Sequence, residues 1–288
     1  MPEARAGWFR LVRLWPIAFI VTLAIITALS PRPTGGPADL PASDHDRADA
    51  MRSVIAALAP SSMVLIGMDP DLGTYAEIRP AVRAILSDLL ARGMNLSFVS
   101  FSPEGRAIAA AELERIRRLA GTGLSTLDLG FVTGAEAAMV RSVTAIIPQG
   151  ATGAVADLIR SEGGGMAAFD LVVVVGGGDL GARSWVEQVG TRLPDLPMMA
   201  VAPTFAEPEL QPYLRTGQLR AVLATVRDDA AYVAMSGSAF AGSLMAGDAP
   251  PSGMAMLIGL LVALAVFAAC SAGGLGGAIR AGLAARTR

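Results

Sequence analysis

Lysine is missing from this chain of 288 residues, in which all 23 basic residues are arginine. A Schiff-base lysine, a lysine general base and the lysine of a phosphate-binding P-loop are therefore excluded. Cysteine and histidine are scarce as well, with one residue of each. These scarcities remove most of the common hydrolase chemistries before any motif is considered.

The single cysteine and the single histidine are both poorly placed for chemistry. Cys270 lies inside an apolar run, so no disulfide can form within the chain and no cysteine cluster can hold a metal. His45 lies in a polar, acidic stretch, where a Ser-His-Asp or Cys-His pair would have to use it. We therefore expect a protein that is not an enzyme and that has no cofactor.

Strong positive charge is lacking too, because the formal net charge is -2. A nucleic-acid-binding protein needs a basic surface that displaces counterions, so nucleic acid is not an expected partner. Apolar residues, in contrast, make up 53% of the chain, and the mean hydropathy is +0.52. They concentrate near the two ends, which indicates a membrane protein.

The first apolar run covers 14–29, carries no charge and follows Arg5, Arg10 and Arg13. With snorkelling of Arg13 it approaches the roughly 20 residues that a membrane span needs. A cleaved signal peptide is the alternative. Pro31 follows the candidate cleavage site and disfavours cleavage, so we expect 1–30 to be a cytoplasmic N-terminus with an uncleaved transmembrane helix.

The second apolar run covers 253–279, without a charged residue, and is long enough for a tilted span. A basic tail, 280–288, follows it with Arg280, Arg286 and Arg288. Arginines flanking both spans on their outer sides place both termini in the cytoplasm by the positive-inside rule. We expect a plasma-membrane protein, in contact with the lipid bilayer, whose central domain is extracytoplasmic.

Two stretches beside the predicted spans read as linkers, 31–58 and 236–252, because they are rich in proline, glycine and small residues. The domain expected between them is 59–235. Strand-like apolar runs occur there at 62–68, 95–101, 124–132, 169–175, 198–201 and 219–226. Helical patterns separate them at 78–89, 106–120, 135–146, 154–160, 185–193 and 208–214.

This alternation predicts an α/β domain with a doubly wound, mostly parallel, six-stranded sheet. It resembles the Rossmann-like and flavodoxin-like superfolds in that rhythm alone, and no motif identifies a family. The charged residues of the second helix, Glu112, Glu114, Arg115, Arg117 and Arg118, are interpreted as a solvated face.

Acidic residues follow almost every predicted strand, at the edge where ligands bind in such sheets. A divalent metal held by Asp69, Asp71 and Asp179 is one hypothesis. The simpler alternative is that these residues cap helices, since each strand exit is also a helix start.

A glycine-rich turn follows the strongest strand and contains Gly176, Gly177, Gly178, Asp179 and Gly181. Glycines before a helix allow the backbone to approach an anion, and the spacing matches G-x-G-x-x-G. The motif follows the fourth predicted strand instead of the first, which disfavours dinucleotide binding. Another small ligand, and a plain tight turn, both remain open.

Three functions follow from these observations. The leading hypothesis is a membrane-anchored, non-enzymatic interaction module that assembles with a membrane protein partner or with itself. The second is an extracytoplasmic domain that binds or senses a small, anionic ligand at 176–181. The third is a divalent-metal-dependent enzyme using Asp69, Asp71 and Asp179.

Overall fold

A computed structural model describes residues 42–120 and 125–237, which belong to one compact unit of the chain, 35–248. Both predicted spans, the tail 280–288 and nearly all of the predicted linker 236–252 lie outside the described residues. Within the described part, no helix has the length and apolar character of a membrane span.

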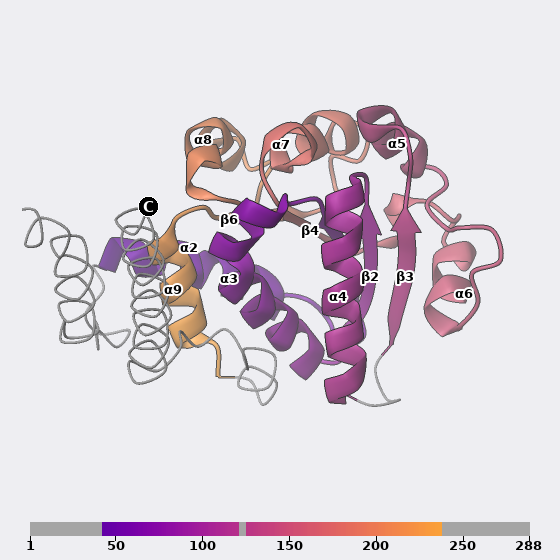
Figure 1. Cartoon of the computed structure of the whole chain (residues 1–288), viewed down its shortest axis with the longest axis horizontal. Helices are drawn as coiled ribbons and strands as arrows, with labels where there is room; N and C mark the ends of the chain where they lie inside the picture. Colours follow the sequence, from indigo (N-terminus) through magenta and orange to yellow (C-terminus); the bar gives the residue numbers. More distant parts are fainter. Residues whose placement is uncertain (1–41, 121–124, 238–288) are drawn as a thin grey trace, which may run out of the picture. The chain divides into compact units, whose positions relative to one another are not determined.

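Six parallel strands form one sheet, shown in Figure 1. They are β1 (Met63–Met68), β2 (Asn95–Ser100), β3 (Thr126–Phe131), β4 (Leu171–Val175), β5 (Met198–Val201) and β6 (Ala221–Leu223). Their order, β3-β2-β1-β4-β5-β6, is that of the Rossmann fold. The predicted α/β sheet is confirmed, and it is parallel throughout. The flavodoxin-like order, 2-1-3-4-5, is not the one observed.

The central strands are buried on both sides, which explains their continuous apolar sequences. Every residue of β1 and of β4 is buried. Val64 and Ile66 pack into one core, whereas Leu65 packs into a second core on the opposite side of the sheet. This alternation follows from the two-residue period of a strand.

Helices cover both sides of the sheet. The first core is closed by α2 (Ala42–Ala56), α3 (Leu72–Ala91), α4 (Pro103–Ala120) and α9 (Val226–Met235). The second is closed by α5 (Ala135–Ser142), α6 (Ala154–Ser161), α7 (Ala182–Trp185) with the π-helical turn η5 (Val186–Gly190), and α8 (Glu207–Arg215). The sheet is therefore doubly wound, as expected.

Helix α2 lies in a stretch predicted to be linker, 31–58. Its residues Ala48, Met51 and Ile55 are buried in the first core, so the domain begins well before residue 59. The sequence disguises this helix because its apolar positions are few and polar or acidic residues surround them. Tertiary packing, not a strong apolar stripe, holds it in place.

Glu112 on α4 is buried, whereas the sequence predicted that it lies on a solvated face. It forms an ion pair with the buried Arg83 of α3, with 2.6 Å between Glu112 Oε1 and Arg83 Nη2. Arg83 Nε lies 3.0 Å from Glu112 Oε2, so the contact is bidentate. The other side of α4 carries the exposed charges, and the interpretation of Glu112 as solvated was wrong.

Helices α2 and α9 lie side by side and run in the same direction. Arg47 of α2 pairs with Asp228 at the start of α9, and Arg52 of α2 donates to the carbonyl of Met235 at its end. The sixth strand is shorter than the predicted 219–226, because Thr225 caps α9 by accepting a hydrogen bond from Asp228 N. The first and last described helices thus pack against each other on the same side of the sheet as α3 and α4.

Candidate functional site at the carboxyl edge

The carboxyl ends of all six parallel strands meet at one edge of the sheet, called here the carboxyl edge. The chain leaves β1 toward α3 on one side of the sheet and leaves β4 toward α7 on the other. The adjacent pair β1 and β4 is therefore the topological switch point, where Rossmann-like proteins bind ligands. It brings the predicted residues around Asp69 and Gly176 together.

Asp69, directly after β1, is buried and fixes the turn after β2. Its Oδ1 accepts hydrogen bonds from the amides of Phe101 and Ser102, at 2.7 and 2.8 Å, and from Ser102 Oγ at 3.0 Å. Its Oδ2 is buried without a hydrogen-bond partner among the described residues. Burial raises the pKa of Asp69 to about 6, against the opposing effect of these donors.

The glycines of 176–181 are explained largely by close packing. A Cβ on Gly176 would lie 2.8 Å from the backbone of Asp69 and Pro70, and its φ of +128° favours glycine independently. A Cβ on Gly177 would lie 2.9 Å from the Phe205 ring, and one on Gly181 would meet Gly177. Only Gly178, with a φ of +72°, faces open space.

Asp71 and Asp179 do not join Asp69 in a metal site. Asp71 caps α3, its Oδ1 accepting from Thr74 N at 2.9 Å. These hydrogen bonds lower the pKa of Asp71. Asp179 lies exposed in the short turn η4 (Gly178–Leu180). Within 42–120 and 125–237, no three or more His, Cys, Asp or Glu side chains are arranged to hold a metal ion.

The turn after β1 also lacks the features of a dinucleotide site. In a Rossmann fingerprint this turn carries the glycines, and the pyrophosphate sits at the helix N-terminus. Here the turn reads Asp69-Pro70-Asp71, and the Asp71 carboxylate already occupies the N-terminus of α3. Its negative charge repels a phosphate at that position.

Beyond the switch point, the carboxyl edge contains a hollow of about 530 Å³ next to β5 and β6. It is bounded by the turn η6 (Thr204–Ala206) and by the starts of α8 and α9. Its lining residues are Arg47, Thr204, Glu207, Thr225, Val226, Arg227 and Asp228. Arg47 spans its wall, with Nη2 2.6 Å from Glu207 Oε1 and Nη1 2.9 Å from Asp228 Oδ2.

Asp229 lies next to this hollow and is buried, and its Oδ1 has no hydrogen-bond partner among the described residues. Burial, with the nearby carboxylates of Asp228 and Glu77, raises the pKa of Asp229 to about 8. Glu77 of α3 in turn accepts hydrogen bonds from Thr204 N and Oγ1, at 2.9 and 2.6 Å. These hydrogen bonds join α3 to η6 at the carboxyl edge.

Three exposed apolar side chains lie along the same edge. Leu72, Phe205 and Val226, called here the apolar edge patch, have 68%, 63% and 61% of their surface exposed. Leu72 and Val226 are the first residues of α3 and α9, directly after the capping residues Asp71 and Thr225. Sequence analysis missed them, although an apolar residue directly after a helix cap at a strand exit was a usable signal.

Close approaches between neighbouring segments bring together the loops that carry these three residues. Gly176, after β4, packs on the backbone of Asp69 and Pro70, close in sequence to Leu72. A Cβ on Gly177 would lie 2.9 Å from the ring of Phe205, so these two segments pass close to each other. Thr204, the neighbour of Phe205, shares the hollow with Val226. The patch therefore runs across the exits of β1, β4, β5 and β6.

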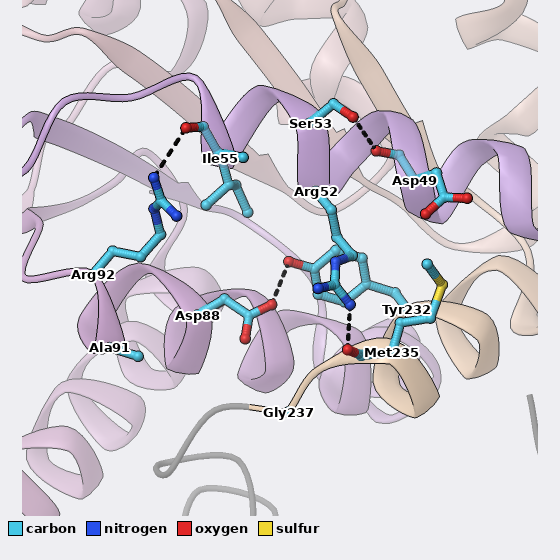
Figure 2. Close-up of a pocket in the computed structure, with 11 residues that line it drawn as sticks. Asp49, Arg52, Ser53, Ile55, Asp88, Ala91, Arg92, Tyr232, Met235 and Gly237 are labelled. Atoms are coloured by element: carbon cyan, nitrogen blue, oxygen red, sulfur yellow. Dashed lines mark hydrogen bonds between the residues drawn. The ribbon is translucent and has the colours of Figure 1, made fainter.

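A second cavity, of about 560 Å³, lies at the opposite end of the helices and is shown in Figure 2. Helices α2, α3 and α9 all end there. Arg92 donates to the carbonyl of Ala56 at 3.0 Å, and Arg52 donates to that of Met235. Tyr232 donates to Asp88 Oδ2 at 2.8 Å. Arginines at helix C-termini satisfy free carbonyls and offset the helix dipoles, so this cavity is a structural junction.

The strand order defines the class: this is an α/β protein with a Rossmann-like fold. No protein-family model matches the chain, and no curated protein is similar to it. Among solved structures, it is similar to a short-chain dehydrogenase/reductase (glucose/ribitol dehydrogenase) from Brucella melitensis. The identity is 15% over 66% of this chain and 71% of the other, with a TM-score of 0.25. A similarity this distant carries no argument about activity.

Proposed function

We propose that this chain is a membrane-anchored, non-enzymatic interaction module that assembles with a protein partner through its carboxyl edge. The observation that carries the proposal is the apolar edge patch. Leu72, Phe205 and Val226 expose most of their surface at the exits of β1, β5 and β6, on the same edge of the sheet. Contiguous exposed apolar side chains with a polar surround are typical of protein interaction sites.

The polar residues of the carboxyl edge support the same function. Asp69 holds a turn, Asp71 caps a helix, and Glu207 and Asp228 hold Arg47. Each of these groups has a structural task that keeps the edge in shape. A preformed edge loses little conformational entropy on association, which favours binding.

The predicted apolar spans at 14–29 and 253–279, with their flanking arginines, support the anchored part of the proposal. Two anchors at the same membrane would hold the domain close to the extracytoplasmic surface. A partner in that membrane then meets the domain at a high effective concentration, so even a modest patch suffices for assembly.

A pull-down of the full-length protein from membranes in mild detergent tests this function. A triple variant, Leu72→Gln, Phe205→Gln and Val226→Gln, removes the apolar edge patch. A control variant, Leu119→Gln with Leu158→Gln, changes exposed apolar residues on α4 and α6. We expect a stoichiometric partner with the wild type and the control, and its loss with the triple variant. A solitary wild-type protein, or a partner kept by the triple variant, overturns the proposal.

A second candidate function is the binding of a small ligand at the switch point. It is supported by the unpartnered Asp69 Oδ2 and by the open space at Gly178. A ligand screen by thermal shift tests it, with Gly178→Val as the comparison variant. The candidate is abandoned if no ligand shifts the wild type, or if Gly178→Val leaves every shift unchanged.

A further inference from the structure

We propose that the partner segment recognised by the carboxyl edge is basic and apolar, with arginine or lysine side chains next to its apolar anchors. This inference rests on the proposed function and goes further by naming the chemistry of the partner. It is motivated by the carboxylates that lie beside two members of the apolar edge patch, Leu72 and Phe205.

Two carboxylates flank Leu72. Asp71 precedes it in sequence, and its carboxylate accepts from Thr74. Glu104, at the start of α4, reaches back so that its Oε2 lies 3.4 Å from Leu72 N. Both side chains are exposed, and these hydrogen bonds come from backbone and hydroxyl groups, which leave the negative charge in place.

Phe205 has two acidic neighbours as well. Glu77 accepts hydrogen bonds from Thr204, the residue before Phe205. Asp179 is exposed and lies two residues after Gly177, where a Cβ would lie 2.9 Å from the Phe205 ring. Two arginines of the same edge are held by other acids: Arg47 by Glu207 and Asp228, and Arg183 by Glu209 at 3.6 Å. A third, Arg227, lines the hollow next to Val226, so the carboxylates concentrate around Leu72 and Phe205.

An apolar surface with excess negative charge selects its occupant by charge complementarity. Cationic groups beside the partner's apolar anchors would meet Asp71, Glu104, Glu77 and Asp179. An acidic segment, or a bilayer with anionic headgroups, would be repelled. The hollow beside Val226, with Thr204 and Thr225 in its wall, offers room for one anchoring side chain.

The inference is tested with two fluorescent probe peptides, one alternating arginine with leucine and one alternating glutamate with leucine. Full-length protein in nanodiscs of neutral lipid is titrated against each, and fluorescence anisotropy gives the dissociation constants. We expect the arginine peptide to bind at least tenfold more tightly than the glutamate peptide. We also expect its affinity to fall several-fold between about 50 and 300 mM salt.

Two charge variants separate recognition by the edge from general electrostatics. The first, Asp71→Asn with Glu104→Gln and Asp179→Asn, removes three negative charges from the edge and keeps one side-chain oxygen at each position, which can still accept from Thr74 N at position 71 and from Leu72 N at position 104. The second, Glu114→Gln with Glu162→Gln and Asp195→Asn, removes the same charge from exposed positions elsewhere. We expect the first variant to weaken binding of the arginine peptide at least fivefold and the second to leave it within twofold.

Equal effects of the two charge variants, or equal binding of the two peptides, would overturn the inference. The proposed function has its own readout, because the membrane partner is lost with the apolar triple variant whatever its charge. A partner that is lost with that variant but kept by the edge-charge variant would leave the function standing and refute the basic segment. Capture of a second copy of this chain through the same edge would also refute it.

Discussion

Two buried carboxyl groups give the domain a particular dependence on pH. The pKa of Asp69 is raised from 3.8 to about 6 and that of Asp229 from 3.8 to about 8, in both cases mainly by burial. The folded chain therefore keeps protons that the unfolded chain releases. Their contribution to stability is complete below a pH of about 4. For Asp229 it is lost as the pH rises toward about 8.

Asp229→Asn removes the larger of these two effects. Because the buried carboxylate has an unpartnered oxygen and acidic neighbours, we expect the variant to gain at least about 1 kcal/mol over the wild type at pH 9. At pH 5 the difference should be much smaller. Denaturant unfolding of the full-length protein in detergent, followed from pH 5 to 9, measures it. Asp195→Asn, at an exposed turn, is the control, and a difference that does not change with pH would contradict the assignment.

Substitutions at two glycines of the turn 176–181 distinguish the cost of a steric clash from the cost of backbone strain. Gly176→Ala places a Cβ 2.8 Å from the backbone of Asp69 and Pro70 and forces alanine to a φ of +128°. We expect this change to cost more than about 2 kcal/mol. Gly178→Ala meets open space and carries only the left-handed penalty of about 1 kcal/mol. Thermal unfolding of both variants measures the two losses of stability. Equal losses would mean that the close approach at Gly176 does not constrain this position.

At the scale of elements, α3 and α4 are joined by the buried pair of Arg83 and Glu112. Removing one partner leaves an uncompensated charge, so Glu112→Gln should cost about 3 kcal/mol. Replacing both, as Arg83→Met with Glu112→Leu, should recover most of that loss because the desolvation of the charges disappears with them. Denaturant unfolding of the single and double variants tests this. A double variant no more stable than Glu112→Gln would contradict the explanation.

The strands of the sheet could largely be predicted from the sequence, whereas helix α2 and the ion pair of Glu112 could not. The continuous apolar run of β4, Leu171–Val175, identifies a strand buried on both sides from sequence alone. Helix α2 was not predicted because its buried residues Ala48, Met51 and Ile55 are surrounded by polar residues in the sequence. The burial of Glu112 was not predicted because its ion-pair partner, Arg83, is 29 residues away in the sequence. Both depend on long-range contacts that no local pattern contains.

At the scale of the whole molecule, the strand order decides which predicted residues meet. Sequence analysis placed Asp69 and Gly176 after different strands, and the parallel pairing of β1 with β4 makes them neighbours. The same order places the three segments of the apolar edge patch, which are far apart in the chain, at one edge of the sheet, and this arrangement could not be predicted from the sequence. Among the described residues, Asp69, Asp71 and Asp179 do not come together as a group of metal ligands, and Asp71 caps α3 instead.

Photo-crosslinking in native membranes is the sharpest test of the proposed contact between the carboxyl edge and a membrane protein partner. We would place p-benzoylphenylalanine at Phe205 and, as the control, at Leu158 on α6. Both positions are exposed, at 63% and 45%. The account predicts one discrete crosslinked protein from position 205, joined at a segment with arginine or lysine beside apolar residues, and none from position 158. No crosslink at position 205, or the same crosslinked proteins from both positions, would contradict it.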